Sequence, residues 1–176
     1  MVHLVKRFVG SLLARPVSVQ DRDWVMGYLS EPEADIWLQM GVADQNHSLG
    51  VAQAVASQIN HGGETNGVPA SQMIAAALLH DSGKTVSDLA TMTRVFATLV
   101  WAVTSDAKAV EWAGNPTGWK KRLGQYRLHP QIGAARLEAV GSRPIVVDWV
   151  RDHHQPQSQW STPPQAGQLL RRCDDD

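Results

Sequence analysis

The sequence predicts an all-α protein, and three observations support that prediction. Nearly every segment repeats its apolar residues at the three-to-four-residue spacing of a helix. Three segments carry a proline at or near the expected first helical turn, where its fixed φ angle and missing N–H are tolerated. No segment alternates polar and apolar residues in the manner of a half-buried strand. We therefore expect a single helical domain over residues 1–176.

Residues 1–40 are expected to form an N-terminal helical extension. Residues 2–14 have an amphipathic pattern, and charged residues and a glycine interrupt it, so it is too short and broken to span a membrane. Ser18, followed by Asp21, is a start signal for a second helix, because a serine side chain can accept a hydrogen bond from a free N–H of the first turn.

The remaining predicted helices form a core over residues 44–174. They cover approximately residues 44–59, 70–80, 87–103, 119–126, 130–140, 144–153 and 164–172. The helix over 70–80 is apolar on all sides, which is typical of a helix buried among others. Glycine and proline mark the loops over 61–67, 114–118 and 155–164.

Composition narrows the classes of function. The chain has 176 residues, 43% of them hydrophobic, which is enough for one packed core. Lys and Arg number 16 against 17 Asp and Glu, so we expect no stable nucleic-acid binding. The single cysteine, Cys173, excludes an intramolecular disulfide framework and suits a reducing compartment. We expect a cytoplasmic protein with no membrane partner.

Histidines carry the functional signal. Five of the seven lie in or at the ends of predicted apolar helices: His47, His80, His129, His153 and His154. Taken singly, each is more readily explained as a core histidine with a satisfied hydrogen bond. However, His80 and Asp81 end the most apolar helix, and a buried carboxylate beside imidazoles is costly without a compensating cation. Because five histidines and Asp81 exceed the needs of one ion, the pattern indicates a two-metal centre.

Residues 78–84, Leu-Leu-His-Asp-Ser-Gly-Lys, resemble the central signature of the HD superfamily of metal-dependent phosphohydrolases. Four other blocks resemble the flanking blocks of that family in the right order: 47–52, 129–134, 152–154 and 169–174. The resemblance covers roughly three quarters of the chain. It implies a helical bundle of the HD type.

The resemblance also implies a ligand set for two ions that share one carboxylate. The first ion would be held by His47, His80, Asp81 and Asp174. The second ion would be held by Asp81, His129, His153 and His154. Successive helix residues point about 100° apart, so His153 and His154 can both be ligands only if the helix ends there, which the following Gln155-Pro156 permits.

Two basic residues are candidates for substrate binding. The resemblance places Lys84 against the phosphate of the substrate, so Asp81 and Lys84 are the expected catalytic residues. Arg127, with residues 120–122, is the basic cluster nearest to a ligand block, although a solvated helix face explains it equally well. The Gly-Tyr-Pro segment of the HD-GYP enzymes is missing after the histidine pair, so their cyclic dinucleotide substrate is not implied.

The expected function is therefore that of a metal-dependent phosphoric ester hydrolase. It would cleave a phosphoester or phosphoanhydride of a small phosphorylated substrate, such as a nucleotide, with a metal-bridged hydroxide. The expected cofactors are two divalent transition metal ions, Mn, Fe, Ni or Zn, with Mg as an alternative. Two other classes stay open: a di-iron oxygenase with the same ligands, and a metal-binding regulatory module without turnover. The substrate, the number of ions and the oligomeric state also stay open.

Overall fold

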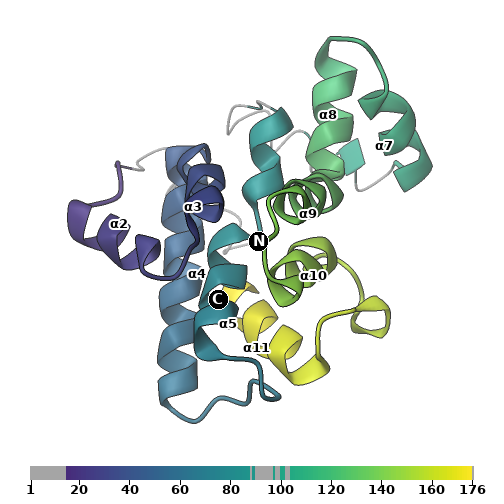
Figure 1. The fold of residues 1–176 in the computed structure, drawn as a ribbon. Helices are drawn as coiled ribbons and strands as arrows, with labels where there is room; N and C mark the ends of the chain where they lie inside the picture. Colours follow the sequence, from purple (N-terminus) through teal and green to yellow (C-terminus); the bar gives the residue numbers. More distant parts are fainter. Residues whose placement is uncertain (1–14, 88, 90–96, 98–99, 102–103, 176) are drawn as a thin grey trace.

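The computed structural model describes residues 15–87, 89, 97, 100–101 and 104–175 (Figure 1). All regular structure in these residues is helical, which confirms the all-α prediction for the described part of the chain. The predicted helix over 2–14 and most of the predicted helix over 87–103 lie outside the described residues. Within the described ranges, no helix is both long enough and apolar enough for a membrane crossing.

The helices follow the predicted order closely. In chain order, the elements are α2 (Val19–Met26), α3 (Glu31–Leu38), α4 (Val42–Asn60), α5 (Ala70–Leu79), the 3-10 helix η1 (Ser82–Ser87), α7 (Asp106–Ala113), α8 (Trp119–Arg127), α9 (His129–Ala139), α10 (Pro144–Asp152), the 3-10 helix η2 (Gln157–Gln159) and α11 (Pro164–Asp175). Proline occupies the first turn of both α9 and α10, and the Ser18 side chain caps α2 by accepting a hydrogen bond from the Asp21 N–H at 3.1 Å.

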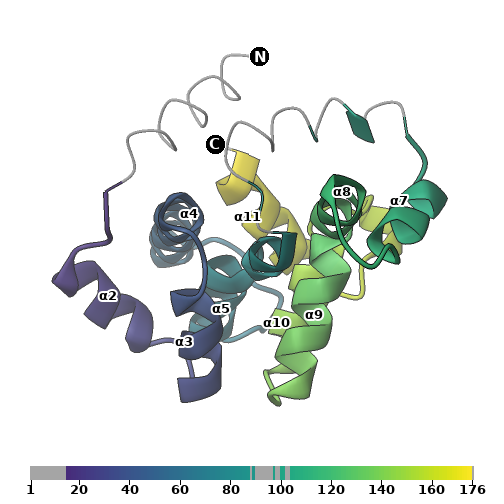
Figure 2. The ribbon, with the colours of Figure 1, turned by 90° about the horizontal axis from the view of Figure 1, so that it is seen from above.

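The α5 helix lies at the centre of the bundle (Figures 1 and 2). Every residue from Met73 to Leu79 is buried, and α3, α4, α10 and α11 all contact this helix. A helix with no polar face is stable in water only when other helices cover it on every side. The wholly apolar pattern of this segment therefore explains both its central position and the burial of the residues that follow it.

Two helices were not predicted from the sequence. α3 hides a charged residue, Glu33, on its buried face, so its apolar pattern is incomplete. α7 buries only Ala109 along its length. α3 packs against α5, and therefore part of the expected N-terminal extension belongs to the packed core; the domain limits themselves stay a prediction.

α7 and α8 form a hairpin beside the main bundle (Figure 2). Ala109 and Leu123 pack with Leu89, Ala97 and Trp101 in a second, smaller apolar cluster. α8 also contacts η1 and the start of α9. The hairpin therefore adjoins the segment of chain that follows Asp81.

Candidate metal centre

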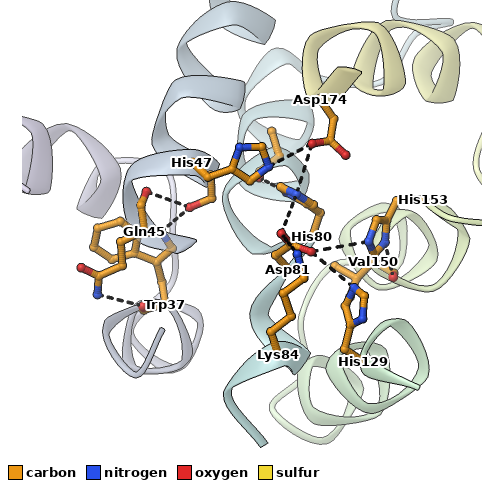
Figure 3. A network of polar contacts seen from close by, with 12 residues as sticks. Trp37, Gln45, His47, His80, Asp81, Lys84, His129, Val150, His153 and Asp174 are labelled. Carbon is orange, nitrogen blue, oxygen red and sulfur yellow. Dashed lines mark hydrogen bonds and ion pairs between the residues drawn. The ribbon is translucent and has the colours of Figure 1, made fainter. Parts of the chain in front are cut away.

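Side chains from five parts of the chain converge at one end of α5 (Figure 3). His80 and Asp81 follow the last residue of α5 directly and are 1% and 2% exposed. His47 comes from α4, His129 from the first turn of α9, His153 from the end of α10 and Asp174 from the last turn of α11. The burial of His80 and Asp81 follows from the position of α5, because its apolar surface carries the chain into the interior.

Gly83 allows the turn after Asp81 to reach the start of α9. A Cβ atom at this position would lie 2.0 Å from the carbonyl oxygen of His129 and 2.7 Å from the backbone nitrogen of Gly133. Only a residue without a side chain can make this approach. Gly83 thereby brings the His129 ring within reach of the Asp81 carboxylate.

The first group of potential ligands consists of His47, His80 and Asp174. Their ligand atoms all lie within 4.8 Å of one another. The Nε2 atom of His47 is 3.0 Å from Oδ1 of Asp174, and Nε2 of His80 is 3.7 Å from the same oxygen. α11 continues through Asp175, so the Asp174 carboxylate is held by a regular helix.

The second group consists of His129, His153 and His154, whose ligand atoms also lie within 4.8 Å of one another. α10 ends at Asp152, so the condition for both neighbouring histidines to face one point is met, and their ring centroids are 4.1 Å apart. The buried Asp152 carboxylate accepts hydrogen bonds from the N–H groups of Ser161 and Thr162, at 2.6 and 2.8 Å. These bonds hold the chain in place beyond the helix end.

Asp81 lies between the two groups, and its two oxygens face different sides. Oδ2 is 3.4 Å from Nε2 of His80, in the first group. Oδ1 is 3.4 Å from Nε2 of His129 and 3.7 Å from Nε2 of His153, in the second group. A carboxylate with this placement can serve two ions at once, one through each oxygen.

The three buried histidines share one orientation. Each donates its Nδ1–H to the backbone carbonyl three residues earlier: His80 to Ala77 at 2.8 Å, His129 to Tyr126 at 2.7 Å and His153 to Val150 at 2.9 Å. Their Nε2 atoms are buried and have no hydrogen-bond partner in the described part of the structure. Buried polar atoms are normally satisfied, and a histidine that ligates a metal usually donates its other N–H to such an acceptor. The Nε2 atoms are therefore oriented as metal ligands.

The electrostatic field of the first group favours a positive charge. Burial lowers the pKa of His80, but the carboxylates of Asp81 and Asp174 outweigh it and raise the pKa from 6.5 to about 9. Burial acts to raise the pKa of Asp81 and of Asp174, yet the neighbouring cations hold both pKa values below the ordinary range. Both carboxylates are thus ionised at neutral pH, and they attract either a proton on His80 or a metal ion.

In the second group, burial outweighs the neighbouring carboxylate in setting the pKa of His129. Burial lowers the pKa of His129 from 6.5 to about 4, so this ring is neutral at pH 7. Because its Nδ1 holds the hydrogen, Nε2 presents a bare lone pair to Oδ1 of Asp81, and two acceptors face each other at 3.4 Å. A cation bound between them would satisfy both atoms, so this donor set fits a metal ion.

Lys84 closes one side of the centre. Its ammonium group donates a hydrogen bond to Oδ2 of Asp81. Burial lowers the pKa of Lys84, but Asp81, Tyr126 and Asp44 outweigh burial and raise it, so the side chain is charged at neutral pH. Neither Tyr126 nor the buried Asp44 was predicted from the sequence, although Asp44 lies one helical turn before His47.

Arg127 lies on the surface at the end of α8. Its guanidinium group is 2.8 Å from the Asp106 carboxylate, and 43% of its side chain is exposed. The contact with Asp106 favours the alternative interpretation of Arg127, a solvated helix face. A role of Arg127 in substrate binding stays a prediction.

Comparison of the chain with known protein families, with curated proteins and with solved structures gives no match. The assignment of a function therefore depends on the geometry of the centre. The described residues contain two histidine-rich groups that could hold metal ions, joined by one buried carboxylate.

Proposed function

We propose that the protein is a metal-dependent phosphohydrolase with a helical bundle of the HD type. The observation that carries the proposal is the pair of ligand groups on either side of Asp81, with three buried Nε2 atoms aimed between them. Nitrogen and oxygen ligands without a thiolate suit Mn, Fe, Ni or Zn, with Mg as an alternative. The order of the five sequence blocks supports the same family.

In this proposal, each ligand group holds one divalent ion. His47, His80 and Asp174 bind the first, His129, His153 and His154 bind the second, and Asp81 contributes one oxygen to each. When bound, divalent ions supply positive charge for the phosphoryl oxygens and lower the pKa of a water molecule to about 7. The backbone carbonyls of Ala77, Tyr126 and Val150 keep the three buried rings in the ligating orientation.

The chain itself supplies the remaining functions of a hydrolase. Lys84, with 14% of its side chain exposed, places an ammonium group beside Asp81, where it would contact a phosphoryl oxygen as negative charge develops there. The pKa values of Asp81 and Asp174 are lowered, so both carboxyl groups are ionised at neutral pH. They can therefore bind a cation before any substrate is present. The proposed substrate is a small phosphorylated molecule, such as a nucleotide.

The test combines metal analysis with a panel of phosphate esters. Elemental analysis of the purified protein should show divalent transition metal at one to two equivalents per chain, and the panel should include generic phosphoesters and nucleotides. His80→Ala should lose both metal and hydrolysis while keeping its helical content. His61→Ala is the matched control, because His61 is exposed and its Nδ1–H donates to the Ser57 carbonyl away from the centre.

The outcomes separate the proposal from its rivals. Hydrolysis of one phosphoester, lost in His80→Ala and kept in His61→Ala, supports the proposal. Metal-dependent oxygen consumption without phosphate release identifies a di-iron oxygenase instead. Bound metal with neither activity across the panel identifies a regulatory module, and both results overturn the proposed hydrolase.

A further inference from the structure

An open cavity lies between α8 and η1. Its volume is about 330 Å³, at the lower end of the range for small-molecule pockets. η1 contributes Val86 and Ser87 to the lining, and α8 contributes Lys121, Arg122 and Gln125. Residues 116–118 of the α7–α8 loop complete the described part of the wall.

The lining of the cavity is positively charged. Lys121 and Arg122 are basic, and none of the described lining residues is acidic. Lys121 is half-buried, and its ammonium group donates to the Pro116 carbonyl at 3.1 Å, which is a neutral acceptor. A half-buried ammonium that is bonded to a carbonyl keeps its full charge and two further donors for an anion.

Other lysines of the described chain are held differently. Lys84 donates to the Asp81 carboxylate, and Lys108 donates to the Glu111 carboxylate at 2.8 Å. Lys120 lies over the rings of Trp112 and Trp119, at 6.0 and 5.8 Å from their centroids. Lys121 therefore stands out as a cation that lines a cavity and whose described partner carries no charge.

Neutral donors accompany the two cations in the cavity. The Thr117 hydroxyl and the Gln125 amide belong to the same lining. Cations combined with hydroxyl and amide donors match the oxygens of a phosphate group, each of which accepts several hydrogen bonds. An apolar ligand would leave these groups without partners, and a cationic ligand would be repelled.

Both walls of the cavity, η1 and α8, also carry residues that lie beside the candidate metal centre. The Ser87 hydroxyl donates to the Lys84 carbonyl at 2.8 Å. Gln125 directly precedes Tyr126, whose carbonyl orients the His129 ring. Lys121 and Arg122 lie roughly 8 Å along α8 from its end at Arg127, just before His129. An anion in the cavity would thus lie beside the centre but outside its ligand shell.

We propose that this cavity is a phosphate-binding site, separate from the metal centre, in which Lys121 is the principal contact and Arg122 adds positive charge to the lining. The bound group would be either a second phosphate of the substrate or the phosphate of a separate regulatory molecule. The binding itself does not depend on the proposed hydrolase activity. Its test can therefore fail while the proposed function stands, or succeed while the proposed function fails.

The test is a titration of the full chain, loaded with diamagnetic Zn²⁺, with inorganic phosphate, followed by amide chemical shifts in NMR spectra. We expect saturable chemical-shift changes at Thr117, Gly118 and Gln125. Sodium chloride at equal ionic strength should produce no saturable change at these residues. Lys121→Gln combined with Arg122→Gln should weaken this binding by about tenfold or more, because one charge-assisted contact and a neighbouring positive charge are lost. Lys120→Gln removes the same charge one residue away and should leave the affinity unchanged.

Opposite results would overturn the proposal. Shifts that are absent, that sodium chloride reproduces, or that saturate only at residues flanking His80 and His129 would each exclude a phosphate site in this cavity. If the double variant fails to fold, the single variant Lys121→Gln should still weaken binding by several-fold with an unchanged thermal transition. An equal affinity in that folded single variant and in the parent chain would also contradict the assigned contacts.

A kinetic arm distinguishes the two sources of the phosphate group. If the group belongs to the substrate, the double variant should raise KM for compounds with two phosphate groups and not for those with one. If it belongs to a regulator, added phosphate should change the rate of the parent chain on a single-phosphate compound, and the variant should not respond. Either pattern supports the site; identical kinetics in the two proteins under all conditions would count against it.

Discussion

Asp81 is the residue on which the proposed centre depends most, because its oxygens face both ligand groups. Asp81→Asn keeps the shape of the side chain but removes its charge and one acceptor oxygen. We expect metal affinity to fall by at least about tenfold in both groups. Asp174→Asn should weaken mainly the first group, since Asp174 pairs with His47 and His80 of that group. Calorimetric titration with Zn²⁺ and Mn²⁺ measures both effects, and unchanged stoichiometry and affinity in Asp81→Asn would refute the bridging role.

A variant of Lys84 can distinguish substrate binding from metal binding. Its ammonium group contacts the Asp81 carboxylate but is not itself a metal ligand at neutral pH. Lys84→Met should therefore retain the metal and lower kcat/KM by roughly 10²–10³, the range for loss of one preorganised group that stabilises the transition state. Elemental analysis and phosphoester kinetics on the same preparation test this prediction. Loss of metal with unchanged kinetics in the residual holoenzyme would contradict it.

Gly83 tests how strictly the backbone sets the centre. A Cβ atom would lie 2.0 Å from the His129 carbonyl oxygen, so Gly83→Ala must push η1 away from α9. We expect a loss of about 3 kcal/mol in the free energy of unfolding, the upper end of overpacking effects, together with weaker metal binding at His129. Gly50→Ala is the control, because a Cβ there meets no atom within 4 Å other than its own stretch of helix. This helical position should gain about 0.5–1 kcal/mol. Denaturant unfolding monitored by circular dichroism gives both values, and equal stability of the two variants would contradict the prediction.

At the scale of elements, Glu33 joins α3 to the connection between α9 and α10. Its buried carboxylate accepts hydrogen bonds from Ser30 and Ser142 and pairs with Arg143 at 3.0 Å. Burial raises the pKa of Glu33, but these contacts outweigh it and hold the pKa below its ordinary value of 4.5. A depressed pKa contributes stability above the unfolded pKa, and that contribution is lost as the pH falls through the folded pKa.

Glu33→Gln should therefore lower the free energy of unfolding by about 2 kcal/mol at pH 7, because a buried acceptor and its charge are lost. The difference between the variant and the parent chain should shrink as the pH falls below about 4.5. Glu31→Gln, at an exposed position of the same helix, serves as the control. Unfolding in urea across pH 3–7 measures the effect, and a constant difference at all pH values would contradict the assignment to this carboxyl group.

Elements with a full apolar pattern were predictable from the sequence, and those without one were not. The largely apolar α5 and the proline starts of α9, α10 and α11 appear within a few residues of their predicted positions. α3 and α7 lacked a sufficient pattern: Glu33 interrupts the buried face of α3, and α7 buries a single alanine. The periodicity of apolar residues indicates burial of apolar surface. A helix that is held by a buried ion pair, or that buries few side chains, is therefore not predicted from this pattern.

The candidate site shows the same division. Histidines and aspartates are visible in a sequence, and the structure brings six of the predicted ligands around Asp81 or beside it. The backbone carbonyls of Ala77, Tyr126 and Val150 orient three of those ligands. Every residue type has such a carbonyl, so the sequence does not show which of them accept these hydrogen bonds. Arg127 was a candidate for substrate binding because it lies near His129 in the sequence, but its side chain pairs with Asp106. Direction of a side chain depends on tertiary contacts, which spacing alone does not reveal.

At the scale of the whole molecule, the centre joins segments that are distant in sequence. His47 and Asp174 are 127 positions apart, and their side chains meet at 3.0 Å. α4, α5, α9, α10 and α11 each present a ligand or end beside one. Without a metal, a proton on His80 and the ammonium of Lys84 balance the two carboxylates, so we expect the metal-free chain to fold. A bound ion would connect these helices and stabilise the native state further, because the unfolded chain has no assembled site.

This coupling predicts that metal raises the melting temperature of the protein. At an ion concentration about 100 times Kd, binding to the native state alone adds about 2.7 kcal/mol, which corresponds to a Tm increase of about 5–10 °C for a chain of this length. Scanning calorimetry of the chelated protein, with Zn²⁺ or Mn²⁺ added back, should show this increase and its dependence on ion concentration. His80→Ala should abolish the increase. His61→Ala should keep it, since His61 follows the end of α4 and its side chain donates to the Ser57 carbonyl. A Tm that is independent of metal in the parent chain, or an equal increase in His80→Ala, would show that the convergent histidines bind no ion and that their burial serves packing alone.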